Sequence, residues 1–251
     1  MQRSDRLLVL TWHAVDERES VISVSPAGLR GQVRALAQRG FRGISLAQAF
    51  AERETAGAFP ARSAVLTFDD GYRSVNRHAL PTLASSGFTA TVFLTSGLVG
   101  LPAREAAARN PDLDRDILDW AQAAELLEAG WEIGSHTVTH PDLSRLDEAA
   151  LESELGDSKT ELEQRLQRPV RSLAYPYGRL NHRVRDAAAR HYAHACTTRL
   201  ALFAGGDPLR IDRIDMFYMQ DELRFGKLLD GKLDVWLRLR RGLRAARSLL
   251  N

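Results

Sequence analysis

The stretch Ala64-Val65-Leu66-Thr67-Phe68-Asp69-Asp70-Gly71 changes abruptly from apolar to acidic residues and ends in a glycine. Its first five residues are apolar or β-branched, which is typical of a buried strand. Asp69 and Asp70 follow where that strand ends, and Gly71 allows a sharp turn. A bare Asp-Asp-Gly is more often an ordinary solvated turn than a functional site, so its meaning depends on the rest of the chain.

Other short apolar runs resemble this one, and helical patterns lie between most of them. These runs cover residues 7–11, 41–45, 89–95, 131–135, 170–175, 193–197 and 210–214. Strands that alternate with helices indicate right-handed crossovers and a mostly parallel sheet of the α/β class. About eight strands favour closure into a (β/α) barrel, in which ligands bind at the carboxyl ends of the strands. Polar residues directly after each run are therefore the candidates for chemistry.

Two more runs end in residues that can do chemistry. His136 and His140 follow the run 131–135 and are four positions apart. Such a pair also arises by chance, but two imidazoles and a carboxylate from a neighbouring strand end make a three-ligand set for a divalent metal, with positions left open for water. The run 170–175 leads into the turn Pro176-Tyr177-Gly178, which is rigid and aromatic. Such a turn is often only packing, but its backbone N–H groups would receive an oxyanion if they face the barrel mouth.

Three motifs, taken in order and spacing, resemble a known family. They are Thr67-Phe68-Asp69-Asp70-Gly71, His136-Thr137-Val138-Thr139-His140 and Tyr175-Pro176-Tyr177-Gly178. They are similar to the motifs of the polysaccharide deacetylases, the NodB-like members of carbohydrate esterase family 4, over residues 8–213. The resemblance implies a distorted (β/α) barrel of seven to eight mostly parallel strands. It also implies a bound divalent metal, most often zinc, with Co, Ni or Mn as alternatives.

The resemblance also implies a role for each motif residue. Asp69 corresponds to the catalytic base that takes a proton from metal-activated water. The metal ligands correspond to Asp70, His136 and His140. The backbone N–H of Tyr177 corresponds to the donor that stabilises the oxyanion. The reaction implied is hydrolysis of N-acyl groups on amino sugars, by chemistry that a Lewis acid and a general base can supply together.

The sequence departs from the usual family pattern at two places. Leu173 and Ala174 stand near the position of an arginine that orients the catalytic aspartate, and no histidine follows His194 to protonate the leaving amine. A first run ending in His13, together with the Tyr-Pro-Tyr-Gly turn, resembles the subset that acts on poly-N-acetylglucosamine. We take His13 as the candidate general acid, with a structural hydrogen bond as the alternative. Arg213 is a weaker candidate for the absent arginine, because most arginines are solvated.

Composition and charge indicate how the chain is organised. Its 251 residues are 44% hydrophobic and 26% charged, enough for a substantial core. No repeat or linker divides it, so we expect a catalytic domain at 1–223 and a basic amphipathic tail at 224–251. The net charge is +2, but the tail alone carries eight Lys or Arg against two Asp. The single cysteine, Cys196, excludes an intrachain disulfide and reads as a small buried residue.

The tail has two interpretations that the sequence leaves open. Leucines alternate with arginines, which is typical of an amphipathic helix on an anionic membrane face, or of a helix docked on the barrel's own surface. No nucleic-acid-binding motif is present. No apolar run reaches the roughly 18 residues of a membrane span, and the run 7–10 is too short for a signal peptide. We therefore expect a cytoplasmic protein, in peripheral contact with the inner face of the membrane.

Several functions compete for the same residues. The first is removal of N-acetyl groups from a cell-envelope polysaccharide or its lipid-linked precursor, and the second is deformylation of a lipid-linked amino sugar. A non-haem iron oxygenase also uses two histidines and one carboxylate, but it needs no base at Asp69. A glycan-binding barrel with a degenerate site is the remaining alternative, suggested by the two missing family residues.

Overall fold

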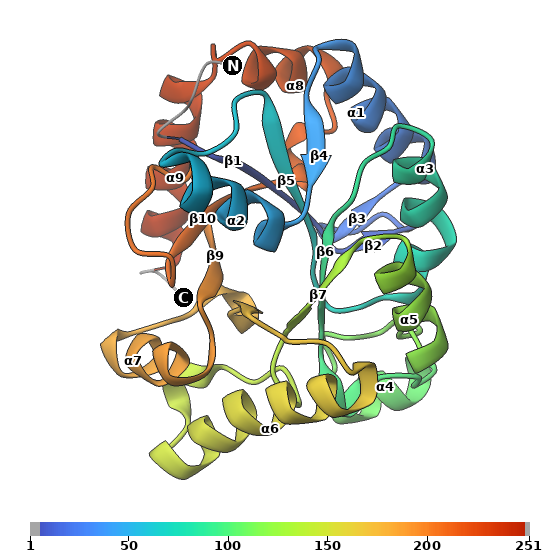
Figure 1. The fold of residues 1–251 in the computed structure, drawn as a ribbon, viewed down its shortest axis with the longest axis vertical. Coiled ribbons are helices and arrows are strands. Elements are labelled where there is room, and N and C mark those ends of the chain that lie inside the picture. The colour runs from blue at the N-terminus through green and yellow to red at the C-terminus, as the bar shows by residue number, and fades with distance from the viewer. Residues whose placement is uncertain (1–5, 249–251) are drawn as a thin grey trace.

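Eight parallel strands form one sheet within residues 6–248, the part of the chain that the computed structural model describes, with side chains up to residue 243 (Figure 1). The strands are β1 (Leu8–Trp12), β4 (Arg42–Ile44), β5 (Ser63–Phe68), β6 (Thr91–Leu94), β7 (Glu132–Ser135), β8 (Ser172–Ala174), β9 (His194–Leu200) and β10 (Ile211–Asp215). Each coincides with one of the eight predicted runs. The α/β class and the parallel sheet are therefore confirmed.

The sheet closes on itself into a seven-strand barrel. Its order is β1-β10-β9-β8-β7-β6-β5-β4, and β1 also pairs with β5. The register explains why β4 stays outside the ring: it pairs with the start of β5, at Ser63–Val65, whereas β6 pairs with the end of β5, at Thr67 and Phe68. Two strands thus share one edge of β5, and this irregularity is the distortion that the sequence analysis expected.

Helices surround the barrel (Figure 1). The α-helices are α1 (Pro26–Gln38), α2 (Leu46–Ala56), α3 (Leu80–Ala84), α4 (Ala103–Arg109), α5 (Trp120–Glu128), α6 (Glu148–Leu166), α7 (His182–His191), α8 (Glu222–Leu229) and α9 (Asp234–Ser248). Shorter elements are β2 (Ala14–Val15), β3 (Ser23–Val24), the π-helix η1 (Val75–Ala79) and the 3-10 turns η2 (Ser96–Leu98), η3 (Leu143–Arg145), η4 (Pro176–Gly178) and η5 (Met216–Met219). Local signals start the helices: the Ser25 side chain accepts from Gly28 N, with Pro26 in the first turn.

The barrel interior changes from apolar to polar along the strands. The part of the interior that lies before this polar layer along the strands is filled by buried apolar side chains. They are Val9, Val65, Phe93, Ala174, Cys196 and Ile211. Because side chains alternate with period two, the next inward positions on β1 and β5 are Thr11 and Thr67, and the inward position after Thr67 is Asp69. Thr11 and Thr67 both accept hydrogen bonds from Arg213. Strand alternation therefore carries Asp69 to the rim above a polar layer.

The C-terminal segment docks on the barrel. Helix α8 spans the 223/224 boundary that the sequence analysis placed between domain and tail, and the side chains of Phe225 and Leu228 are buried in the main core cluster. Leu233 and Leu237 join the same cluster. One face of the tail thus packs on the protein itself, as the second interpretation of the tail expected.

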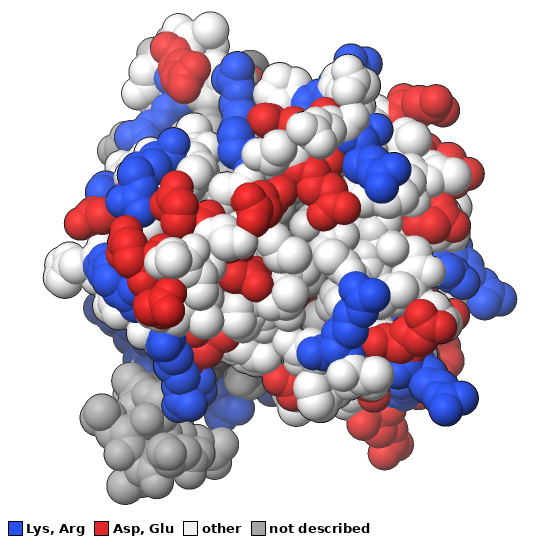
Figure 2. Space-filling view, turned by 90° about the horizontal axis from the view of Figure 1, so that it is seen from below, with Lys and Arg blue, Asp and Glu red and all other residues white. Residues whose placement is uncertain are grey.

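Charges of both signs are interspersed on the face shown in Figure 2. Lys and Arg side chains lie next to Asp and Glu there, so this face carries no continuous field of one sign. No helix in the described residues has the length and apolar character needed to cross a bilayer.

Candidate active site

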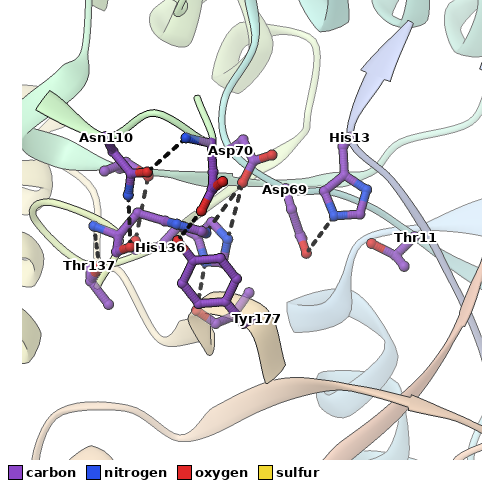
Figure 3. A network of polar contacts seen from close by, with 12 residues as sticks. Thr11, His13, Asp69, Asp70, Asn110, His136, Thr137 and Tyr177 are labelled. Atoms are coloured by element: carbon purple, nitrogen blue, oxygen red, sulfur yellow. Dashed lines mark hydrogen bonds and ion pairs between the residues drawn. The ribbon is translucent and has the colours of Figure 1, made fainter. Parts of the chain in front are cut away.

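The ends of β5, β7 and β8 bring the predicted site residues together at one end of the barrel (Figure 3). Asp69 and Asp70 follow β5, His136 follows β7, and His140 closes the loop after it. All four side chains are buried, with relative exposures of 2%, 4%, 2% and 5%. Charged groups are seldom buried this deeply unless they are paired or bind a metal.

Asp70, His136 and His140 converge as a potential metal site. Asp70 Oδ1 lies 3.4 Å from His136 Nε2 and 3.6 Å from His140 Nε2. One ligand atom from each residue lies within 4.8 Å of the other two. Two imidazole nitrogens and one carboxylate oxygen are a donor set that suits zinc, and three protein ligands leave room for water. The residues therefore fit a catalytic divalent metal.

The second nitrogen of His136 supports this interpretation. His136 Nδ1 lies 2.7 Å from Ala174 O, and because a carbonyl only accepts, Nδ1 carries the proton and Nε2 is free to bind a cation. His140 Nδ1 is buried without a hydrogen-bond partner within residues 6–248. His140 Nε2, the nitrogen that lies nearest to Asp70, is the one placed to share a cation with it.

Burial and neighbouring charges act on the protonation of the three groups. Burial alone would raise the pKa of Asp70, but its contact with His136 and the other nearby imidazoles hold it well below its usual range. Burial, followed by repulsion from His136, lowers the pKa of His140 to about 4. His140 is therefore neutral at ordinary pH, the form that binds a metal. Burial disfavours the charged form of His136 too, but Asp70 and Asp69 raise its pKa overall.

Asp69 pairs with a fully buried arginine. Arg213 on β10 donates to both carboxylate oxygens, with Nη1–Oδ1 at 2.7 Å and Nη2–Oδ2 at 2.6 Å. Arg213, the weaker candidate for the absent arginine, thus does contact this aspartate: it is 1% exposed and not solvated, as most arginines are. Burial alone would raise the pKa of Asp69, but the charge of Arg213 and its hydrogen bonds lower it below the usual range. This bidentate contact holds Asp69 both ionised and oriented.

His13 also lies close to the Asp69 carboxylate (Figure 3). Its Nε2 is 3.9 Å from Asp69 Oδ2, too far for a hydrogen bond but close enough for an ion pair when His13 is protonated. The side chain is 20% exposed, whereas that of Asp69 is 3% exposed. His13 is thus the residue of this pair that solvent reaches.

Tyr177 adopts a left-handed backbone conformation in the turn after β8. Its φ is 59°, and φ of Gly178 is 67°. A Cβ at Gly178 would lie 2.1 Å from Thr198 Oγ1, so the turn requires glycine there. The N–H groups of Gly178 and Arg179 donate to Tyr175 O and Pro176 O. Within residues 6–248 the Tyr177 N–H donates to no backbone acceptor outside its own turn.

The side chain of Tyr177 packs against the metal-site histidine. Its ring meets His140 edge to face, with centroids 4.7 Å apart, and its hydroxyl donates to Asp112 Oδ2 at 2.7 Å. Burial and the Asp112 carboxylate raise the pKa of Tyr177 to about 12. The hydroxyl therefore keeps its proton at ordinary pH.

Three residues that hold this site were not predicted from the sequence. Glu154 on α6 accepts from Val138 N and Thr139 N, at 2.8 and 3.0 Å. Asn110 and Asp112 lie in the connection between β6 and α5 and contact the His140 loop and Tyr177. No motif marks these residues. For Asn110 and Asp112 the one available signal is the length of the connection between β6 and α5, since long connections in compact domains are often functional.

The histidines expected to lie away from the rim do so, and Cys196 is buried as expected. His194 begins β9, at the far end of the barrel, and packs on Phe50 with ring centroids 4.0 Å apart. His182 is exposed at the start of α7, and His191 contacts Glu152. Burial raises the pKa of the Cys196 thiol to about 12, so it is not a nucleophile at ordinary pH.

Comparison with known proteins gives concordant results. A family model described as polysaccharide deacetylase matches residues 56–195. The chain is 26% identical over 190 residues to YxkH of Bacillus subtilis, which is classed by its name among the polysaccharide deacetylases; the match covers 75% of this chain and 63% of YxkH. It is 27% identical over 168 residues to a poly-β-1,6-N-acetyl-D-glucosamine N-deacetylase of Staphylococcus aureus, covering 63% of this chain and 55% of that protein. The match thus spans less than two thirds of either relative.

Among solved structures, the fold is similar to the Streptococcus pyogenes deacetylase PplD in complex with acetate. The TM-score is 0.74 at 25% identity, over 85% of this chain and 93% of PplD.

Proposed function

Because the chain belongs to the polysaccharide deacetylase family, we propose that it hydrolyses N-acetyl groups from amino sugars of a cell-envelope polysaccharide or its lipid-linked precursor. The observation that carries this proposal is the pairing of Asp69 with Arg213 directly beside the Asp70-His136-His140 cluster. An ionised, oriented base next to a metal site with open positions is what amide hydrolysis by water requires. An oxygenase has no use for such a base.

The metal that we propose for Asp70, His136 and His140 is zinc, with Co, Ni or Mn as alternatives. The donor set of two nitrogens and one oxygen supports this choice. Once bound, such an ion supplies Lewis-acid chemistry, which makes an amide carbonyl a better electrophile and water a better nucleophile.

The protein's own residues supply the proton transfers and the oxyanion contact. Asp69 accepts a proton from the attacking water, because the charge of Arg213 keeps its carboxylate ionised. The Tyr177 N–H donates to the oxygen on which negative charge develops. The amine must leave protonated, and we assign that proton to His13, which lies 3.9 Å from Asp69 and is reached by solvent.

Assays for free amine test this proposal. The purified protein is incubated with N-acetylglucosamine oligomers and with N-formyl amino sugars, with and without a chelator. We expect amine release from the N-acetyl substrate, its loss with chelator and its return on addition of zinc. Asp69→Asn should lower the rate at least about a hundredfold while zinc affinity is kept, because Asp69 is not a ligand.

Three outcomes would count against the proposal. Amine release that a chelator does not reduce would contradict the proposed dependence on a metal. Unchanged activity of Asp69→Asn, together with glycan binding, would favour a binding barrel. Release from N-formyl substrates alone would favour the deformylase alternative.

We also propose that the C-terminal tail contacts the membrane. Val235, Leu239 and Leu243 on α9 are 63%, 66% and 60% exposed, an unusual display of large apolar side chains. The basic charge of the tail complements an anionic lipid surface. Such contact would place the protein at the inner face of the cytoplasmic membrane, within reach of a lipid-linked sugar.

A further inference from the structure

We propose that Asn110 and Asp112, in the connection between α4 and α5, are positioning residues that brace two parts of the catalytic rim against each other. Asn110 holds the loop that carries His140, and Asp112 holds the turn that carries Tyr177. The inference rests on the proposed function, because it concerns the same site. It assigns a role to a segment outside every motif that marks the site in the sequence.

The Asn110 side-chain amide donates to two consecutive backbone carbonyl groups, those of Thr139 and His140. Its Nδ2 donates to His140 O at 3.0 Å and to Thr139 O at 3.2 Å. The backbone of His140 is left-handed, with φ at 61°, which is unfavourable for a residue other than glycine. Such a conformation persists only where surrounding contacts impose it. Asn110, 9% exposed, supplies two of those contacts from a different element.

Asp112 makes the equivalent contact to the oxyanion turn. Its Oδ2 accepts from the Tyr177 hydroxyl at 2.7 Å. Tyr177 is also left-handed, and its ring is packed edge to face on His140. The hydroxyl bond fixes the outer end of the ring, so the side chain and the backbone N–H of Tyr177 are held as one unit.

The two residues are hydrogen-bonded to each other, and Asn110 is also hydrogen-bonded to α4. Asp112 N donates to Asn110 Oδ1 at 3.0 Å, so the Asn110 amide cannot rotate without breaking contacts on both of its ends. Asn110 N donates to Ala106 O at the end of α4. Leu113, Ile117 and Ala106 belong to a buried cluster of their own. The segment is therefore held by its own packing as well as by its hydrogen bonds.

Neither side chain is a ligand or a base, so the effect of each should pass through the residue that it holds. Loss of the Asn110 contacts frees the His140 loop and should weaken metal binding. Loss of the Asp112 carboxylate frees the Tyr177 turn and should slow the chemical step. Asp112→Ala keeps the backbone N–H that Asn110 Oδ1 accepts from, so the two effects are separable by experiment.

The test is a double-mutant cycle with two readouts. We expect Asp112→Ala and Tyr177→Phe each to lower kcat about three- to tenfold, the usual effect of one hydrogen bond, with KM and zinc affinity within twofold of wild type. The double variant should be no worse than either single one. Asp112→Asn should recover most of kcat, because the amide oxygen still accepts from the hydroxyl. Asn110→Ala should lower the zinc affinity of the apoprotein, measured by competition titration, about tenfold.

Glu105→Ala on α4 is the matched control, since it removes an exposed carboxylate near the brace. Additive losses in the double variant, or failure of Asp112→Asn to recover kcat, would overturn the role of Asp112. Unchanged zinc affinity of folded Asn110→Ala would overturn the role of Asn110. An inactive wild type would instead contradict the proposed function, and the zinc titration would still decide the part played by Asn110.

Discussion

Asp69 and Asp70 are consecutive residues with different partners. Strand alternation directs the Asp69 side chain toward the barrel axis, where Arg213 donates hydrogen bonds to both of its carboxylate oxygens. Asp70 then takes a left-handed backbone conformation, with φ at 69°, and its carboxylate faces His136 and His140. Gly71 continues the turn with φ at 68°. The Asp-Asp-Gly sequence thus gives two adjacent carboxylates different partners, as the roles proposed for them require.

The pairing of Asp69 with Arg213 should set the acid side of the activity profile. Asp69 acts as a base only when ionised, so kcat/KM is lost as the pH falls through its pKa. That pKa is now lowered, because the charge of Arg213 outweighs the effect of burial. In Arg213→Gln burial acts without this compensation, so the pKa of Asp69 should rise above its usual range. The fall in kcat/KM should then occur at a higher pH, by at least about one unit.

Arg213→Lys is the matched variant, because it keeps the charge but not the bidentate contact. We expect it to shift the profile less than Arg213→Gln. Circular dichroism must show that both variants fold. An identical acid limb in wild type and in folded Arg213→Gln would show that Arg213 does not control Asp69.

At the scale of elements, the long helix α6 supports the metal site from outside the barrel. Glu154 accepts two backbone N–H groups of the 138–139 loop and the Thr139 hydroxyl, the last at 2.6 Å. Thr137 Oγ1 accepts from His140 N at 3.0 Å within the same loop. Two histidines four residues apart can share one metal ion only because the loop between them is held in this shape.

Removal of Glu154 should therefore weaken metal binding without touching a ligand. We expect Glu154→Ala to lower zinc affinity about 10- to 100-fold, the usual range for groups that orient metal ligands. Glu154→Gln keeps one acceptor oxygen and should lose less. Glu161→Ala, on the same helix but outside these contacts, is the control. Equal zinc affinity in Glu154→Ala and wild type, by titration of the apoproteins, would show that the loop holds its shape unaided.

On the scale of the whole molecule, α9 is turned with apolar side chains outward. Val235, Leu239 and Leu243 are four residues apart and share one helix face, while Leu237 on the other side is buried in the core. An ordinary surface helix presents its polar face to water. Arg238 is exposed beside the apolar stripe, and Arg240 lies over the Tyr218 ring. This order of residues is typical of a helix that rests on a membrane surface.

Binding to lipid vesicles tests this surface. We expect the wild type to sediment with vesicles that contain anionic phosphatidylglycerol and to bind less as salt is raised. Val235→Asp combined with Leu239→Asp should lower the bound fraction at least about fivefold, with amine release from soluble oligomers unchanged. Val21→Asp, which changes an equally exposed apolar residue elsewhere, should bind as wild type does.

Two results would contradict membrane contact. One is absence of vesicle binding by the wild type. The other is a dimer, measured by light scattering, that the double substitution dissociates, because a second copy of the chain would then cover the stripe.

Much of the architecture was predictable because its causes are local. Eight runs of apolar and β-branched residues, separated by helical patterns, indicate a parallel barrel whatever their partners are. Residues directly after those runs must lie at one end of it, so Asp69, Asp70, His136 and Tyr177 could be placed at the rim from their neighbours alone. The departures from local pattern, such as β4 outside the ring, arise because two strands share the edge of β5.

The sequence by itself indicated which residues are candidates for the chemistry, because strand ends and turn residues are encoded within a few positions and three motifs resemble a known family. Only the tertiary structure decided which residues hold them. Arg213 is 144 positions from Asp69 and meets it only because β10 and β5 both flank β1 in the closed ring. Asn110 and Glu154 contact backbone groups of other elements, and Asp112 contacts the Tyr177 hydroxyl. Such contacts leave no pattern in the chain that makes them.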